Sequence, residues 1–280
     1  MTKVENFLKI PRKGKRMSVA LGMYSIGGVF VCADSHVVST DGIVTSDFKL
    51  QGIECGIGTF VIGNAADDGN AANMVAKEIL DALARCPDKW MIEPVIKKPM
   101  TEWHAGYTQG KPPAMQFVLA ARLGTATRRL YFCEPPNIVV PKSLNEWVVL
   151  GAGAQVLDVL IPEVILGPLY HREALIRAAY LMYRAKKEHV FLKGSETDTL
   201  LISGTTGKVY QPTREEMAKA EAVGPDIDFM LRYCHLGLLG TAPGSDQKEF
   251  LQSFKKMYLE TRKKTDALQF ESLKGIGAGV

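Results

Sequence analysis

Short apolar runs separated by glycine-containing turns dominate the chain from residue 18 to about residue 63. They are rich in β-branched and aromatic residues, a composition typical of β-strands. Gly27 and Gly28 fall between the first two runs, so we expect these two strands to pair as a hairpin. The strands predicted in this part of the chain cover residues 19–23, 29–34, 43–51 and 58–62.

The hydrophobic period then changes from that of a strand to that of a helix. From Asn64 to about residue 86, apolar residues recur every three to four positions, and Asn64 is a suitable N-cap. Asp67 and Asp68 would interact favourably with the positive end of the helix dipole. Pro87 should end the helix. Residues 87–113 carry many Pro, Lys and Trp without a clean period, so we predict a loop with at most one short helix.

The rest of the chain again alternates between the two kinds of pattern. Strands are predicted over 115–123, 129–133, 147–150, 199–203 and 208–211. Helices are predicted over 154–164, 171–187, 214–222, 226–239 and 247–268, with a linker over 240–245. Runs of strands alternating with runs of helices favour an α+β fold with antiparallel sheets. No GxGxxG motif follows a strand, which argues against a dinucleotide-binding fold.

The order of these elements suggests three segments. We expect residues 1–17, which are basic and aperiodic, to form an N-terminal extension or propeptide. Residues 18–212 would form the main domain, and 213–280 a C-terminal helical extension.

Composition narrows the classes of function. The 280 residues carry a formal net charge of +4 with both signs interspersed, which does not indicate a nucleic-acid partner. The five cysteines are odd in number and form no CxxC pair, so we expect neither a disulfide framework nor a zinc site. Free cysteines are typical of a reducing compartment, so we expect a cytoplasmic location. No apolar run is long enough for a membrane helix, and no motif indicates a cofactor or a metal.

The stretch from Ser18 to Gly63 contains the candidate chemistry. Its blocks VCADSHVVSTDGIVTSDFKL and GTFVIGNAADD resemble the proteasome β-subunit family of N-terminal-nucleophile (Ntn) hydrolases, and the resemblance extends over about residues 18–210. It implies an αββα sandwich of two antiparallel sheets flanked by helices. It also implies hydrolysis of peptide bonds by a threonine- or serine-type endopeptidase.

The resemblance assigns roles to individual residues. In the family, the mature chain begins with a threonine or serine, and a catalytic aspartate follows sixteen residues later in an ADS motif. Counting back sixteen residues from Asp34 reaches Ser18, the implied nucleophile. A one-residue deletion aligns both the catalytic lysine, on Lys49, and the oxyanion glycine, on Gly63. Gly63 and Asn64 would then bind the oxyanion and the substrate.

Three features depart from the family pattern. Ala152, in Gly-Ala-Gly, replaces the serine of a GSG motif that assists the amine. Glu188 and Ser195 only approximate an aspartate and a serine that precede the last hairpin. Met17 precedes Ser18, where self-cleaving members have glycine. A start of translation at Met17, followed by methionine removal, would expose Ser18 without self-cleavage.

Two classes of function therefore stay open. The preferred hypothesis is a peptidase or amidase that acts on a polypeptide or peptide and assembles as a homo-oligomer, for which a ring is one form. Hydrolysis of a small amide is a variant of it. The alternative is a non-catalytic structural or binding subunit of a proteasome-like assembly. Neither involves a membrane or a nucleic acid.

Overall fold

The structure, a computed structural model, describes most of the chain. The described residues are 18–38, 44–46, 49–108, 110–125, 127–144, 146–165, 167, 169–189, 192, 194–238 and 247–274. The extension predicted over 1–17 and the linker predicted over 240–245 lie outside them.

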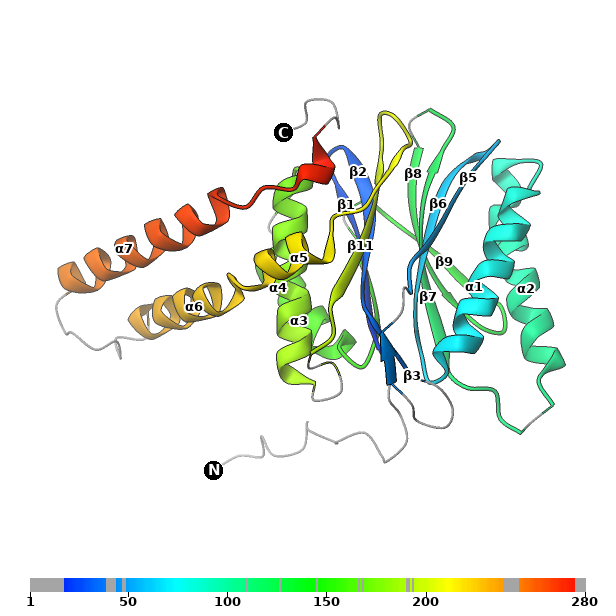
Figure 1. Cartoon of the computed structure of the whole chain (residues 1–280), viewed down its shortest axis with the longest axis horizontal. Coiled ribbons are helices and arrows are strands. Elements are labelled where there is room, and N and C mark those ends of the chain that lie inside the picture. Colours follow the sequence, from blue (N-terminus) through cyan, green and yellow to red (C-terminus); the bar gives the residue numbers. More distant parts are fainter. Residues whose placement is uncertain are drawn as a thin grey trace.

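Two five-stranded antiparallel sheets face each other (Figure 1). The first has the order β10 (Val148–Gly151), β1 (Val19–Ser25), β2 (Gly28–Asp34), β11 (Thr197–Ser203) and β12 (Val209–Tyr210). The second has the order β5 (Gln51–Cys55), β6 (Gly58–Ala66), β7 (Met115–Leu123), β8 (Thr127–Glu134) and β9 (Ile138–Lys142). A separate short pair joins β3 (His36–Val38) to β4 (Val44–Ser46).

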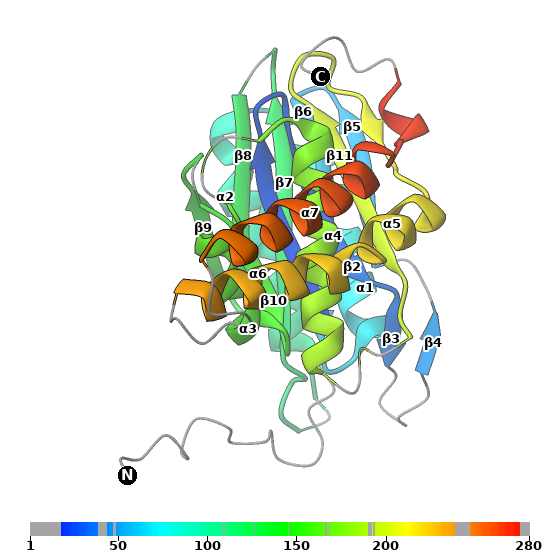
Figure 2. The ribbon, with the colours of Figure 1, turned by 90° about the vertical axis from the view of Figure 1, so that its left-hand side faces the viewer.

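Helices cover both outer faces of the sandwich. On one side, η1 (Lys89–Met91) links α1 (Gly69–Ala84) to α2 (Ile92–Gly106); on the other lie α3 (Ala154–Val164) and α4 (His171–Glu188) (Figure 1). The C-terminal part consists of α5 (Arg214–Glu221), α6 (Gly224–Leu238), α7 (Gln247–Asp266) and η3 (Glu271–Leu273). In Figure 2, α6 and α7 run side by side across α4. The predicted α+β fold, an αββα sandwich with extra C-terminal helices, is confirmed.

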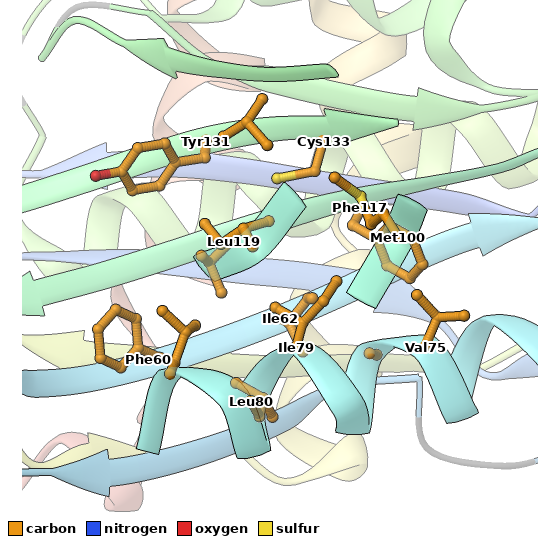
Figure 3. Close-up of a cluster of buried hydrophobic side chains, with 14 of the residues drawn as sticks. Phe60, Ile62, Val75, Ile79, Leu80, Met100, Phe117, Leu119, Tyr131 and Cys133 are labelled. Carbon is orange, nitrogen blue, oxygen red and sulfur yellow. The ribbon is translucent and has the colours of Figure 1, made fainter. Parts of the chain in front are cut away.

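Strand alternation distributes the side chains of each sheet between two cores. Leu21 of β1 faces α3 and α4 in one buried cluster, whereas its neighbour Ala20 packs with Val61 and Val118 of the second sheet. The outer face of the second sheet, under α1 and α2, carries large side chains such as Phe60 (Figure 3). Fully burying a side chain of this size stabilises the fold by about 1.5–3 kcal/mol.

The helix predicted to begin at Asn64 begins later. Strand β6 continues through Asn64, because its residues 64–66 pair with 115–117 of β7 and satisfy their backbone groups there. Asp68 is the N-cap of α1, and its carboxylate accepts from the amides of Asn70 and Ala71. The N-cap prediction for Asn64 was therefore wrong. The predicted place of Asp68, at the helix N-terminus, was right.

The loop predicted over 87–113 is also wrong, because α2 occupies fifteen of these residues. Ile92, Ile96 and Met100 recur every four positions and are buried against α1. Pro99 lies inside the helix and removes one hydrogen bond, which the packing of this apolar stripe offsets. The high proline and lysine content obscured the stripe.

The strand predicted over 43–51 divides into two shorter strands, β4 and β5. Lys49 lies between them, outside both strands, where its side chain reaches Asp34. Strand β9, which pairs with β8, was not predicted from the sequence.

Candidate active site

Asp34, the last residue of β2, is the centre of the candidate site. It is fully buried, and both of its carboxylate oxygens accept hydrogen bonds. Oδ1 accepts from the Val19 amide at 2.7 Å. Oδ2 accepts from the Lys49 ammonium at 2.9 Å and from the His36 amide at 3.1 Å. These three donors provide the pairing that a buried carboxylate requires.

Lys49 is almost as deeply buried, with 1% of its side chain exposed. Burial lowers the pKa of its ammonium group below the ordinary value, and the nearby carboxylates of Asp34 and Asp198 oppose that shift. The carbonyl oxygen of Lys49 accepts a hydrogen bond from Asn64 at 3.4 Å. A buried lysine beside a carboxylate is a frequent feature of catalytic sites.

Ser18 directly precedes β1 and is held from two sides. The amide of the next residue, Val19, is bound by Asp34, and the Ser18 carbonyl accepts from the Ala152 amide at 3.0 Å. Gly151 has φ +83°, and a Cβ there would lie 1.7 Å from the Ser18 carbonyl oxygen. Only glycine suits both the conformation and this close approach. The Gly-Ala-Gly turn therefore fixes the backbone of Ser18.

The two predicted oxyanion and substrate residues lie on β6. A Cβ on Gly63 would lie 2.8 Å from side-chain atoms of Leu50 and Val31, so glycine allows the two sheets to approach here. Asn64 is fully buried; its amide nitrogen donates to the Lys49 carbonyl and, at 2.9 Å, to Asn73. Asn64 thus supports the backbone of Lys49. Binding of an oxyanion or substrate at Gly63 and Asn64 stays a prediction.

Glu188 and Ser195, which only approximate the family's aspartate and serine, have partners of their own. Glu188 is exposed at the end of α4, where its nearest ion-pair partner is Arg184 at 3.6 Å. Ser195 is buried, and its hydroxyl donates to the Leu192 carbonyl. Within the described residues, neither the ion pair of Glu188 nor the hydrogen bond of Ser195 involves Ser18, Asp34 or Lys49.

Sequence reasoning missed a second buried carboxylate near the site. Asp198 of β11 lies opposite Ala33 of β2 and is 2% exposed. It accepts from Nε of Arg214 at 2.6 Å and from Nη2 at 3.0 Å. The available signal was an aspartate within the apolar run TDTLLIS, followed by an arginine shortly after Pro212.

Within the described ranges, no group of three or more His, Cys, Asp or Glu side chains is arranged to hold a metal ion. No helix in the described part of the chain combines the length and apolar character needed to cross a membrane.

The arrangement places a hydroxyl residue at the start of a strand beside a buried lysine–aspartate pair. After cleavage before Ser18, its α-amine would lie one residue from the amide that Asp34 binds. A free α-amine has a pKa of about 8, so it can accept a proton near neutral pH. Such a group can activate its own hydroxyl for attack on a carbonyl.

The fold was compared with known proteins. No family model and no curated protein matches the sequence. Solved structures do match. Anbu from Yersinia bercovieri, an ancestral beta-subunit, is 13% identical with a TM-score of 0.64, over 81% of this chain and 98% of that one. The Anbu complex of Pseudomonas aeruginosa, a helical assembly, is 14% identical with a TM-score of 0.64, over 83% and 99%. A mutant of Anbu from Hyphomicrobium sp. is 15% identical with a TM-score of 0.63, over 78% and 96%.

These similarities show the fold. The chain has the same two-sheet sandwich fold as these Anbu structures, and this is the fold that the blocks around Asp34 and Gly63 predicted.

Proposed function

We propose that the chain is a proteasome-like peptidase or amidase whose nucleophile is Ser18, exposed by removal of the preceding residues. The observation that carries the proposal is the pairing of Asp34 with both the Val19 amide and the Lys49 ammonium. It links the backbone beside the predicted new N-terminus to Lys49, the lysine that the family resemblance assigned to catalysis. The fold similarity supports the same assignment.

The steps follow from the proposed roles. The α-amine of Ser18 takes the hydroxyl proton while Oγ attacks the carbonyl carbon of the scissile amide. The Gly63 amide stabilises the resulting oxyanion, an interaction of a kind worth about 2.7–4 kcal/mol. The amine then gives its proton to the leaving nitrogen, which breaks the C–N bond and leaves an ester on Ser18. Water hydrolyses the ester and restores the hydroxyl.

Lys49 and Asp34 act on this proton transfer by electrostatics. A lysine ammonium near the α-amine favours the neutral, basic form of the amine. Asp34 keeps Lys49 charged and oriented, since a buried ammonium without a carboxylate would lose its proton.

We further propose that the protein forms a homo-oligomer and acts on polypeptides or peptides. The helical assembly of Anbu from Pseudomonas aeruginosa supports the first part. The oligomer's form, the division of the chain at residues 212/213 and the cytoplasmic location stay predictions.

One observation favours the alternative of a non-catalytic subunit. Ala152 contributes its amide to the Ser18 carbonyl but has no hydroxyl to assist the amine, as the family serine does. A non-catalytic structural or binding subunit would retain the sandwich fold and use its surfaces for assembly.

The deciding experiment combines intact mass with covalent labelling. The purified protein, expressed from its own gene, is treated with a peptide epoxyketone, a reagent that needs both a hydroxyl and the adjacent α-amine. We expect a chain that begins at Ser18 and gains one equivalent of reagent, and no labelling of Ser18→Ala. A chain that begins before Ser18 and gains no reagent would establish the alternative.

A further inference from the structure

Helix α5 follows the main sandwich in the sequence, and its first residue, Arg214, forms ion pairs with residues at or next to the start of β11. Arg214 donates to both oxygens of Asp198, at 2.6 Å and 3.0 Å, and to Glu196 at 2.7 Å. The Asp198 side chain is 1% exposed, whereas Glu196 is largely exposed. The geometry is the two-pronged pairing that arginine makes with a carboxylate.

Asp198 also lies near the residue that follows Lys49. Asp198 and Leu50 line one cavity of about 220 Å³. In the sheet, Asp198 lies opposite Ala33, one residue before Asp34. Its charge acts on Lys49 and raises the pKa of the ammonium group, against the effect of burial.

Four charges of alternating sign therefore act on one another in turn: the buried Asp34, Lys49 and Asp198, and the partly exposed Arg214. Asp34 is fixed by two backbone amides, and Arg214 by its place at the start of α5. Lys49 is paired with Asp34 and also feels the charge of Asp198, and the family resemblance provides only the first of these carboxylates. Unpaired charges at such depth are strongly unfavourable, so each member depends on the next.

We propose that Asp198 and Arg214 are positioning residues for Lys49, through which the segment after Pro212 controls the charge at the candidate active site. Their consequence for catalysis rests on the proposed function, but their action on Lys49 does not. Neither residue is proposed to touch substrate.

The same helix offers a matched control. Near the end of α5, Glu221 accepts from Lys186 of α4 at 2.9 Å and 3.0 Å, and Lys186 also donates to Thr197 of β11 at 2.7 Å. The charges that act on Lys49 are those of Asp34 and Asp198. Glu221→Gln thus breaks a similarly buried ion pair of α5 without removing either of them.

The test measures the titration of Lys49 itself. The full-length protein is labelled with lysine carrying ¹³C at Cε, the Lys49 signal is assigned with Lys49→Arg, and its shift is followed from pH 6 to 11. In Asp198→Asn, we expect the pKa of Lys49 to fall by about one unit, the lower end of what a nearby charge produces. In Glu221→Gln, it should equal that of the wild type.

The Arg214 variants keep the test valid if Asp198→Asn does not fold. Arg214→Gln leaves the Asp198 charge uncompensated and should shift the pKa of Lys49 upward, opposite to Asp198→Asn. Arg214→Lys keeps the charge and should restore a near-wild-type value. A Lys49 titration that is unchanged in both charge-removing variants, or that shifts equally in Glu221→Gln, would overturn the inference.

A second measurement, the pH dependence of labelling, distinguishes a failure of this inference from a failure of the proposed function. The pH profile of epoxyketone labelling at Ser18 should move in the same direction as the Lys49 titration. If the titration shifts as expected while the wild type is never labelled, the positioning role stands and the proposed function fails. If the wild type is labelled while neither the Lys49 titration nor the labelling profile changes in the variants, the proposed function stands and the positioning role fails.

Discussion

Lys49 and Asp34 form a buried ion pair, at 2.9 Å, that joins the two sheets at one end of the sandwich. Lys49 lies two residues before β5 of the second sheet, and Asp34 ends β2 of the first. The pair therefore has a structural role that does not depend on catalysis.

Lys49→Met should destabilise the protein by about 3–5 kcal/mol, because it leaves the Asp34 carboxylate buried without its counter-charge. The double variant Asp34→Asn/Lys49→Met should recover part of this loss, since no uncompensated charge remains. Urea unfolding at pH 7 measures both.

The exposed pair of Lys98 and Glu102, with 74% and 66% of the side chains exposed, provides the control. Lys98→Met should cost less than about 1 kcal/mol. Equal losses for Lys49→Met and Lys98→Met would contradict the structural role of the buried pair.

Gly151→Ala should be more destabilising than Gly194→Ala, although both glycines have positive φ, +83° and +80°. At Gly194 no described atom lies within 4 Å of the added Cβ, so only the conformational cost of about 1–2 kcal/mol applies. At Gly151 the Cβ would also collide with the Ser18 carbonyl, adding about 1–3 kcal/mol. Thermal and urea unfolding of the two variants would reveal the difference, and equal losses would mean that the Gly151 contact with Ser18 is unimportant.

Ala152→Ser should accelerate epoxyketone labelling of Ser18 by about a hundredfold, the lower end of what a positioned proton-transfer group contributes. The backbone hydrogen bond from residue 152 to the Ser18 carbonyl is kept in this variant. Labelling must disappear in Ala152→Ser/Ser18→Ala. An unchanged rate would show that the missing hydroxyl does not limit reaction at this site.

His171 should make the stability sensitive to mild acid. Its Nδ1 lies 2.8 Å from the Ser25 hydroxyl at the β1–β2 turn, and burial, then the charge of Arg128, lower its pKa below 6.5. As the pH falls below about 6.5, His171 gains a proton in the unfolded chain before it does so in the folded one, so stability is lost.

His171→Gln should reduce the loss of unfolding free energy between pH 7 and pH 5. Ser25→Ala removes the hydrogen bond but keeps the burial and Arg128, so it should retain the acid sensitivity. If wild type and His171→Gln lose equal stability on acidification, His171 is not the group responsible.

Sequence patterns predicted the elements that pack by a simple period. Strands such as β1 and β2, rich in β-branched residues, and helix α4 were placed within a few residues of their ends. The pattern misled where local signals competed with tertiary contacts. Asn64 has the chemistry of an N-cap, but its backbone pairs with β7; the prolines of α2 indicate a loop, but its apolar stripe packs on α1.

For the candidate site, the sequence alone determined the identities and spacing of Ser18, Asp34 and Lys49, because the motif lies in one continuous stretch. Only the tertiary structure brought Lys49 to Asp34 across two sheets, placed Gly151 against the Ser18 carbonyl and added Asp198 with Arg214. These relations join residues far apart in the chain, and no local period encodes them. They arise because closing the sandwich buries charged groups, and each buried charge requires a partner wherever the fold can supply one.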